Sequence, residues 1–230
     1  MIITNLKVFN KVCTEMQKYC KQEKGESERL FHNVFFMDKN KMCVTNGHFM
    51  VVRNMSDCVI NDETFAFPCN VKPVKTVTSD GEKLIIENKK EKFFDKNKKE
   101  ITFFNWKKGI PTDKPIVTKE YDFSDYEPTK ISLEKESTVT FCENNDVIFD
   151  YKDYNETQAI YSDVVKTDDM FDNINTNKIT TTKFPMNQIY YILKHSKNFI
   201  YEEYPISYRA VPRIFKIKDY DFIIMPILGE

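Results

Sequence analysis

The hydrophobic positions near the N-terminus follow a helical period. From Asn5 to Cys20 the apolar residues recur every three or four positions, and at about 100° per residue they fall on one face of a helix. The opposite face gathers lysines, which we call the basic ridge: Lys7, Lys11, Lys18 and Lys21. The pattern predicts a helix with an apolar underside. A solvated face explains the ridge, and a polyanion-binding face is the alternative.

After this helix the pattern changes to short apolar runs bounded by turn residues, which is typical of strands. Within KMCVTNGHFMVV, at 41–52, the apolar run breaks at Asn46-Gly47, the strongest short hairpin signal. Residues 69–80 predict a short, weak helix broken by Pro73. Strands are predicted in the first half at 30–38, 41–46, 49–54, 58–62, 64–68, 83–88, 91–97 and 99–105.

A change of composition separates the two halves of the chain. Residues 107–130 carry three prolines and little periodicity, as expected of a linker. We therefore predict an N-terminal domain at 1–117, a linker at 118–128 and a C-terminal domain at 129–230.

The second half predicts mainly strands, with one convincing helix that begins near Pro185 and covers 186–198. A polar stretch at 163–177 predicts a long loop, and no helix is found early in this half. Few helices among antiparallel strands favour an α+β fold. The predicted strands of this half are 131–136, 137–144, 146–153, 178–185, 199–209, 211–218 and 219–230.

The charge balance limits which partners the whole chain attracts. Thirty-four basic residues nearly cancel 35 acidic ones, giving a formal net charge of −1. Any site for a polyanion must therefore be a local patch. No apolar window approaches the roughly 18 residues of a membrane span, and no signal-peptide pattern is present. We expect a cytoplasmic protein.

The cysteines, histidines and glycines of the sequence do not form any of the motifs expected of a catalytic or metal-binding site. The six cysteines include no C-x-x-C pair, so we expect small, buried, reduced residues without zinc. The three histidines accompany no nucleophile motif, and no glycine-rich phosphate loop is present. We predict no catalytic residue, metal or cofactor. An enzyme that uses Cys43 with His48 remains an alternative.

Three segments together resemble one family. TNGHFMVV (45–52) resembles the T-D-G-H-R-L motif of bacterial DNA polymerase sliding clamps, the β-type processivity factors, and YDFIIMPIL (220–228) resembles their Y-V-V-M-P-M ending. FFNWKKGIPTDKPIV (103–117) is similar to the G-x-F-P-x-Y segment that closes their middle domain. The resemblance implies two DNA-clamp-type domains, each with antiparallel sheets outside and helices lining the inner face. They would correspond to the family's middle and last domains.

The resemblance also implies an apolar pocket that receives short linear peptides from polymerases, clamp loaders and repair proteins. Phe49 stands where the family has Arg, which would add an aromatic ring to the pocket rim, and Asn46 replaces the usual Asp. The alternative is that His48 only caps a tight turn and that Met225-Pro226 ends an edge strand. Residues matching one wall are Thr45, Gly47, His48 and Met50, those matching the other are Ile223, Met225, Pro226 and Ile227, and Pro68 also lines it.

The family forms rings of six similar domains around duplex DNA, so a two-domain chain would reach six as a homotrimer. The basic ridge, with Lys194 and Lys197 of the second helix, would then contact phosphates without reading sequence. The resemblance thus implies a non-enzymatic processivity factor in DNA replication, and the Asn-, Lys- and Ile-rich composition hints at a phage. A monomeric adaptor or decoy that binds clamp-interacting peptides is the alternative, and a lone α+β enzyme is a third hypothesis.

Overall fold

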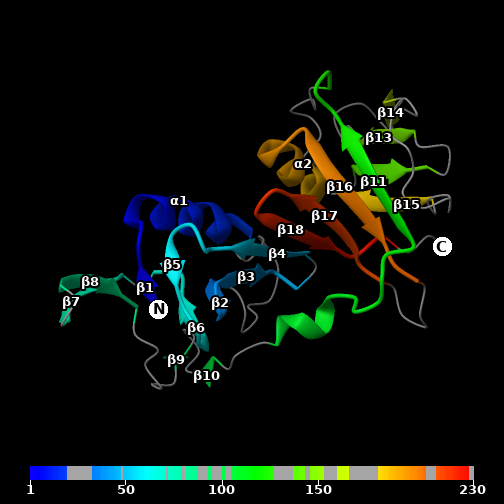
Figure 1. Cartoon of the computed structure of the whole chain (residues 1–230). Helices are drawn as coiled ribbons and strands as arrows, with labels where there is room; N and C mark the ends of the chain where they lie inside the picture. The colour runs from blue at the N-terminus through cyan, green and yellow to red at the C-terminus, as the bar shows by residue number, and fades with distance from the viewer. Residues whose placement is uncertain are drawn as a thin grey trace. The chain divides into compact units, whose positions relative to one another are not determined.

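The computed structural model of the 230-residue chain divides into two compact units, Met1–Lys108 (unit 1) and Gly109–Glu230 (unit 2). Figure 1 labels most of the helices and strands of both, and each unit is described by itself. The structure describes residues 1–19, 33–47, 49–70, 72–78, 81–86, 93–94, 100–101, 105–126, 137–142, 146–152, 160–165, 181–205 and 211–227.

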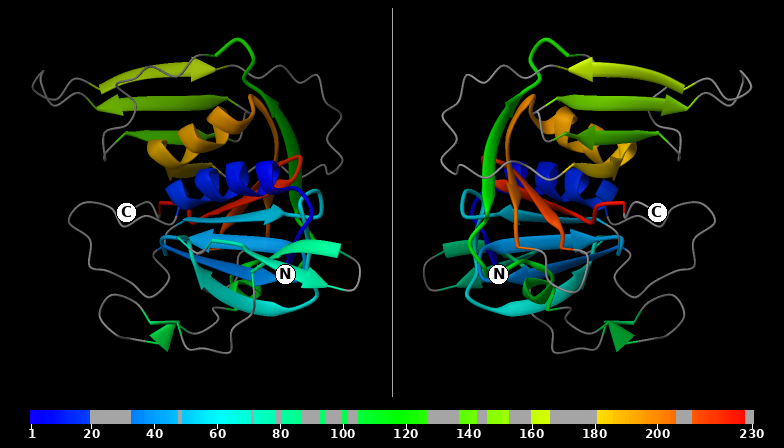
Figure 2. Two further views of the ribbon diagram at one scale, coloured as in Figure 1. Left: turned by 90° about the vertical axis from the view of Figure 1, so that its left-hand side faces the viewer. Right: turned by 90° about the vertical axis from the view of Figure 1, so that its right-hand side faces the viewer.

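Unit 1 begins with strand β1 (Ile2–Ile3), helix α1 (Leu6–Met16) and a 3₁₀ turn, η1 (Gln17–Tyr19). The predicted amphipathic helix is therefore present. Its buried side chains belong to the apolar face read from the sequence: Phe9, Val12, Met16 and Tyr19. Figure 2 shows α1 lying along strands β2–β4 of its unit, so this face forms part of the core.

The first sheet of unit 1 is antiparallel, in the order β4-β3-β2-β6. Register is fixed by pairs such as Val44 with Val51 and Phe36 with Ala66. Nearly every side chain of β2, β3 and β4 is buried, because the strands are apolar on both faces. The strands are β2 (Val34–Asp38), β3 (Lys41–Thr45), β4 (Phe49–Asn54) and β6 (Thr64–Pro68).

A second sheet of unit 1 has the order β5-β1-β8-β7. Strand β7 occupies residues for which the sequence predicted a weak helix, so that prediction was wrong. The segment Val-Lys-Thr-Val-Thr is rich in β-branched residues, which fit a pleated strand better than a helix. The elements are β5 (Val59–Ile60), β7 (Val74–Thr78), β8 (Gly81–Ile85), the separate pair β9 (Phe93–Phe94) with β10 (Glu100–Ile101), and η2 (Trp106–Gly109).

Unit 2 contains an antiparallel sheet in the order β11-β16-β17-β18. Strand β11 pairs with β16 over its whole length, so residues 118–122 of the predicted linker belong to a sheet. The placement of the linker at these residues was wrong: Pro111 and Pro115, two of the three prolines that suggested it, lie before the strand, and Pro128 lies outside the described residues. The strands are β11 (Val117–Asp122), β16 (Asn198–Glu203), β17 (Arg213–Ile217) and β18 (Tyr220–Ile224).

The second sheet of unit 2 has the order β14-β13-β12-β15 and leads directly into helix α2. Asp163, which the sequence placed at the start of a polar loop, lies in β14, while 166–177 fall outside the described residues, as does the strand predicted at 131–136. The elements are β12 (Thr138–Phe141), β13 (Val147–Lys152), β14 (Ile160–Val165), β15 (Thr182–Pro185) and α2 (Met186–His195).

Aromatic rings fill the core of unit 2. Phe141 stacks on Tyr201 with 5.2 Å between ring centroids, and both also contact Phe215. Tyr121 meets Phe141 edge to face at 5.1 Å. Offset and edge-to-face pairs of this kind stabilise a core beyond the burial of area alone. The predicted fold class, α+β with antiparallel sheets and few helices, is confirmed.

Candidate functional site

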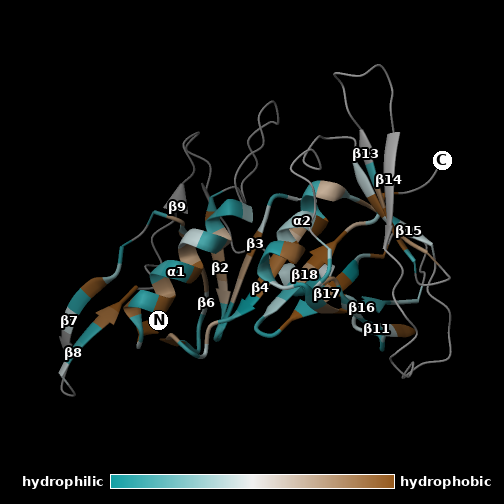
Figure 3. Cartoon of the chain, turned by 90° about the horizontal axis from the view of Figure 1, so that it is seen from above, coloured by the Kyte–Doolittle hydropathy of each residue, from teal (hydrophilic) through white to brown (hydrophobic). Residues whose placement is uncertain are grey.

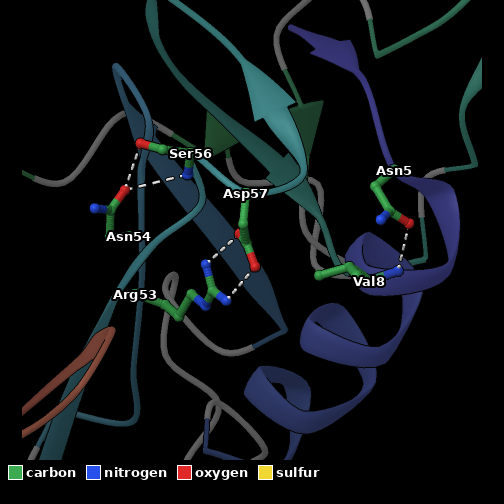
Figure 4. Close-up of polar contacts among 6 residues, drawn as sticks. All are labelled: Asn5, Val8, Arg53, Asn54, Ser56 and Asp57. Carbon is green, nitrogen blue, oxygen red and sulfur yellow. Dashed lines mark hydrogen bonds and ion pairs between the residues drawn. The ribbon is translucent and has the colours of Figure 1, made fainter.

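Helix α1 is held at its start by two sets of contacts. The side chain of Asn5 accepts a hydrogen bond from the Val8 amide at 3.2 Å, which caps the helix (Figure 4). The carbonyl of Cys58 accepts hydrogen bonds from the amides of Thr4 and Asn5. The helix axis is therefore anchored to the turn between β4 and β5.

That turn is fixed by a bidentate ion pair. Arg53 is 5% exposed and donates to both carboxylate oxygens of Asp57, at 2.6 and 2.8 Å (Figure 4). The Arg53 hydrogen bonds hold the pKa of the Asp57 carboxyl below its usual value. Asn54 accepts from the amide and hydroxyl of Ser56 in the same turn. This positioning role of Arg53 and Asp57 was not predicted from the sequence, although their spacing of four residues across a turn was a usable signal.

The anchored helix presents part of the basic ridge to solvent. Lys7 and Lys11 are four residues apart on α1 and therefore share a face, and Lys18 lies in η1; all three are exposed. Figure 3 shows hydrophilic and hydrophobic bands alternating along α1. Lys21, the fourth member of the ridge, lies outside the described residues.

The lysines predicted on the second helix have contacts within their own unit. The Lys194 ammonium lies 4.3 Å from the centroid of the Tyr190 ring and is exposed. Lys197 lies beyond the end of α2, and its ammonium donates to the carbonyl of Tyr126. Lys194 is thus the more accessible of the two cations.

The break in the strand run at 45–49 is a turn pinned by side chains. The Thr45 hydroxyl donates to the Phe49 carbonyl at 2.8 Å and accepts from the Gly47 amide at 2.9 Å. The Asn46 side chain accepts from the Phe49 amide at 3.0 Å. Gly47 adopts φ of 96°, a conformation that glycine reaches without strain. The hairpin predicted from Asn-Gly is present, and His48 lies outside the described residues.

The neighbours of this turn point into unit 1. Phe49 is 3% exposed and meets the Tyr19 ring edge to face at 5.7 Å. The expectation that Phe49 adds an aromatic rim to a pocket is therefore wrong, since its ring belongs to the core beneath η1. Met50 is 8% exposed, and Pro68, at the end of β6, is half-buried.

The C-terminal segment of unit 2 exposes apolar side chains on a fixed backbone. Ile223 is buried in β18, but Met225 and Ile227 are 41% and 40% exposed, with Pro226 half-buried between them. The Ile227 amide donates to the Lys183 carbonyl at 2.7 Å, so the segment after β18 bridges to β15. Two exposed apolar residues are thus held in place without being covered.

Five of the six cysteines lie in the part of the chain that the structure describes. Cys43 and Cys58 are buried as expected, whereas Cys13, Cys69 and Cys142 are only half-buried, so the expectation of burial was wrong for these three; Cys20 lies outside the described residues. Burial raises the pKa of the Cys13 and Cys58 thiols to about 12, so both are protonated at neutral pH. Within the described ranges no group of His, Cys, Asp and Glu could hold a metal ion. Nor does any described helix have the length and apolarity to cross a membrane.

The fold is similar to that of solved bacterial clamps. Over 97% of this chain it superposes on the DNA polymerase III subunit beta of Borrelia burgdorferi, solved with a natural product, with a TM-score of 0.61 and 14% identity. Over 99% it superposes on the Caulobacter crescentus pol III beta, with a TM-score of 0.63 and 10% identity. The chain has the sliding-clamp fold.

A third similar structure is the Helicobacter pylori beta clamp bound to a DNA ligase peptide, with a TM-score of 0.60, 11% identity and 99% of this chain covered. The chain spans 63%, 66% and 65% of the length of these three clamp chains. No model of a known protein family matches the sequence. No curated protein matches it either.

Proposed function

We propose that this chain is a sliding clamp that encircles duplex DNA as a ring and tethers other proteins to it through short peptides. The observation that carries the proposal is the clamp fold, which extends over 97–99% of the chain in the three superpositions. The exposed lysines anchored on α1 support a role in phosphate contacts, which need local positive charge even in a chain of net charge −1.

The ring requires more than one copy. The chain provides two compact units, so three copies provide six. Light scattering over a range of protein and salt concentrations is expected to show a species near three times 27.3 kDa. A monomer at every concentration would contradict the ring and favour the adaptor that binds clamp-interacting peptides.

Exposed apolar residues support the peptide-binding part of the proposal. Met225 and Ile227 are exposed apolar residues among those that match the clamp pocket motifs. Methionine suits varied peptides because its side chain adapts its shape. The same role is proposed for the other residues that match the clamp pocket motifs: Thr45, Gly47, His48, Met50, Pro68, Ile223 and Pro226.

Replacing Met225 and Ile227 together with alanine is expected to weaken peptide binding about tenfold or more, since each side chain gives up apolar burial in the complex. The probe is a fluorescent copy of the DNA ligase peptide that the Helicobacter pylori clamp binds, followed by anisotropy. The matched control is Ile200→Ala, because Ile200 is 39% exposed on β16 and belongs to neither motif. Equal affinity of the double variant and the control would contradict the site, as would no binding by the unaltered chain.

A further inference from the structure

Four aliphatic side chains form a row across the second sheet of unit 1. Ile2 pairs directly with Ile60 on one side and with Ile85 on the other, and Ile85 pairs with Val74. Directly opposite residues of antiparallel strands point to the same face. We call these four residues, Ile60, Ile2, Ile85 and Val74, the aliphatic row.

The row lies on the solvent side of the sheet. Ile60 is 56% exposed and Val74 60% exposed, and Ile2 and Ile85 between them are half-buried. The neighbouring Ile3 and Val59 point to the opposite face and are 6% and 1% exposed, so the core lies there. Brown, hydrophobic stretches mark β7 and β8 in Figure 3. Single exposed aliphatic residues are ordinary, but a contiguous row marks an interaction surface.

The row is too small for a stable contact between folded copies. Four aliphatic side chains expose on the order of a few hundred Å², whereas a standard interface buries about 800 Å² on each partner. A short segment is the better fit. Three strand spacings give the row a length of about 14 Å, and apolar residues at i, i+4 and i+7 of a helix span about 10 Å.

The edge of the sheet disfavours an added strand. Among the described residues β7 pairs with β8 alone, but it carries Lys75 and follows Pro73. Lysine and proline are the residues with which natural proteins protect a sheet edge from further pairing. An occupant that lies across the face, as a helix does, avoids the edge.

The charged residues around the aliphatic row indicate which charges a bound segment should carry. Lys83 precedes Ile85 by two residues on β8 and therefore shares the face of the row. Lys72, which is exposed, precedes Val74 by two residues. Asp62 is exposed beyond Ile60 at the other end. A partner with acidic residues at the β7 end complements this distribution.

We infer that the aliphatic row of unit 1 docks an acidic amphipathic helix of another protein, a surface separate from Met225 and Ile227. The test uses a synthetic amphipathic helix of about 14 residues with leucines at i, i+4 and i+7 and glutamates elsewhere. Anisotropy of the labelled peptide is expected to show binding by the full chain. Ile60→Ser with Val74→Ser should weaken it about tenfold or more, because two apolar contacts are lost.

Ile200→Ser in unit 2 is the matched control and should leave binding unchanged, and circular dichroism checks that the variants fold. If the double variant binds the peptide as tightly as the unaltered chain does, the inference is overturned. It is also overturned if the unaltered chain binds a scrambled peptide, or a peptide with lysines in place of the glutamates, as tightly as the original peptide. Failure of the unaltered chain to bind the original peptide overturns it as well. A lower molar mass of the double variant than of the unaltered chain would assign the row to contacts between copies and equally overturn it. The peptide-binding outcomes do not depend on whether the chain forms a ring on DNA.

Discussion

Reversing the charge of Lys7, Lys11 and Lys18 to glutamate is expected to remove most of the affinity of this chain for duplex DNA at low salt. All three ammonium groups are exposed on the anchored α1–η1 segment, and each phosphate contact releases a counterion. A plot of the logarithm of affinity against the logarithm of salt concentration has a negative slope, which is steeper by about 0.9 for each phosphate contact. Losing three phosphate contacts should therefore make this slope shallower by up to about 2.7 for each chain.

The measurement is anisotropy of a labelled duplex titrated with protein at several salt concentrations. The slope separates contact by these lysines from a general effect of net charge. The matched control reverses three exposed lysines elsewhere, Lys41, Lys108 and Lys114, and changes the net charge by the same amount. We expect the control to keep the slope of the unaltered chain. If both triple variants behave alike, the basic ridge is only a solvated face.

The triple variant should remain folded, which keeps the test interpretable. Glutamate at position 7, in the first turn of α1, is favourable beside the positive end of the helix dipole, while glutamate at position 18 near the other end is unfavourable. These effects are each on the order of 0.3–1 kcal/mol and partly cancel. Circular dichroism and thermal melting provide the check.

The elements that the sequence predicted well are those with strong local periodicity. Helix α1 lies within the predicted 5–20, and β4 and β6 have the predicted bounds. In each the period of apolar residues agrees with the local turn or cap signals, such as Asn5 before α1. The misassigned β7 shows the opposite case: a weak helix broken by Pro73 was predicted there, whereas the β-branched residues of 74–78 favour the strand that is present.

Features that depend on distant partners could not be predicted. Strand β11 follows a proline-rich stretch and is recognisable only by its pairing with β16, about 80 residues later. The aliphatic row combines four strands, and its members share a face only through their register.

The candidate site shows the same limit. The sequence located the exposed Met225 and Ile227 by motif, and the Asn-Gly turn by its local chemistry. It could not foresee that Phe49 faces Tyr19, because alternation along β4 does not say which face meets the helix. Nor could it foresee that Lys197 donates to Tyr126, a contact across 71 residues of sequence.

Arg213→Met is expected to lower the free energy of unfolding of unit 2 by about 3 kcal/mol or more, because it removes a cation from beside a buried carboxylate. The Arg213 and Glu203 side chains are 6% and 1% exposed, with 3.8 Å between Nε and the nearer carboxylate oxygen. Arg213 also donates to the Val211 carbonyl, and the Tyr201 hydroxyl donates to Glu203 at 2.8 Å. Burial, with the charge of Glu203, raises the pKa of Tyr201, so this hydroxyl keeps its proton.

A double-mutant cycle with Glu203→Gln separates loss of the charge pair from loss of packing. Glutamine keeps an oxygen that accepts from Tyr201, so the Arg213→Met, Glu203→Gln variant should recover part of the loss and give a coupling energy of at least about 1 kcal/mol. Denaturant unfolding followed by circular dichroism measures all four states. The comparison variant is Asp57→Asn in unit 1. The Asp57 side chain is 48% exposed, so water screens its ion pair with Arg53. We expect this variant to lower the free energy of unfolding by about 1 kcal/mol or less. Additive effects of the two unit 2 substitutions would show instead that Arg213 stabilises the sheet by packing and by its bond to Val211, independently of Glu203.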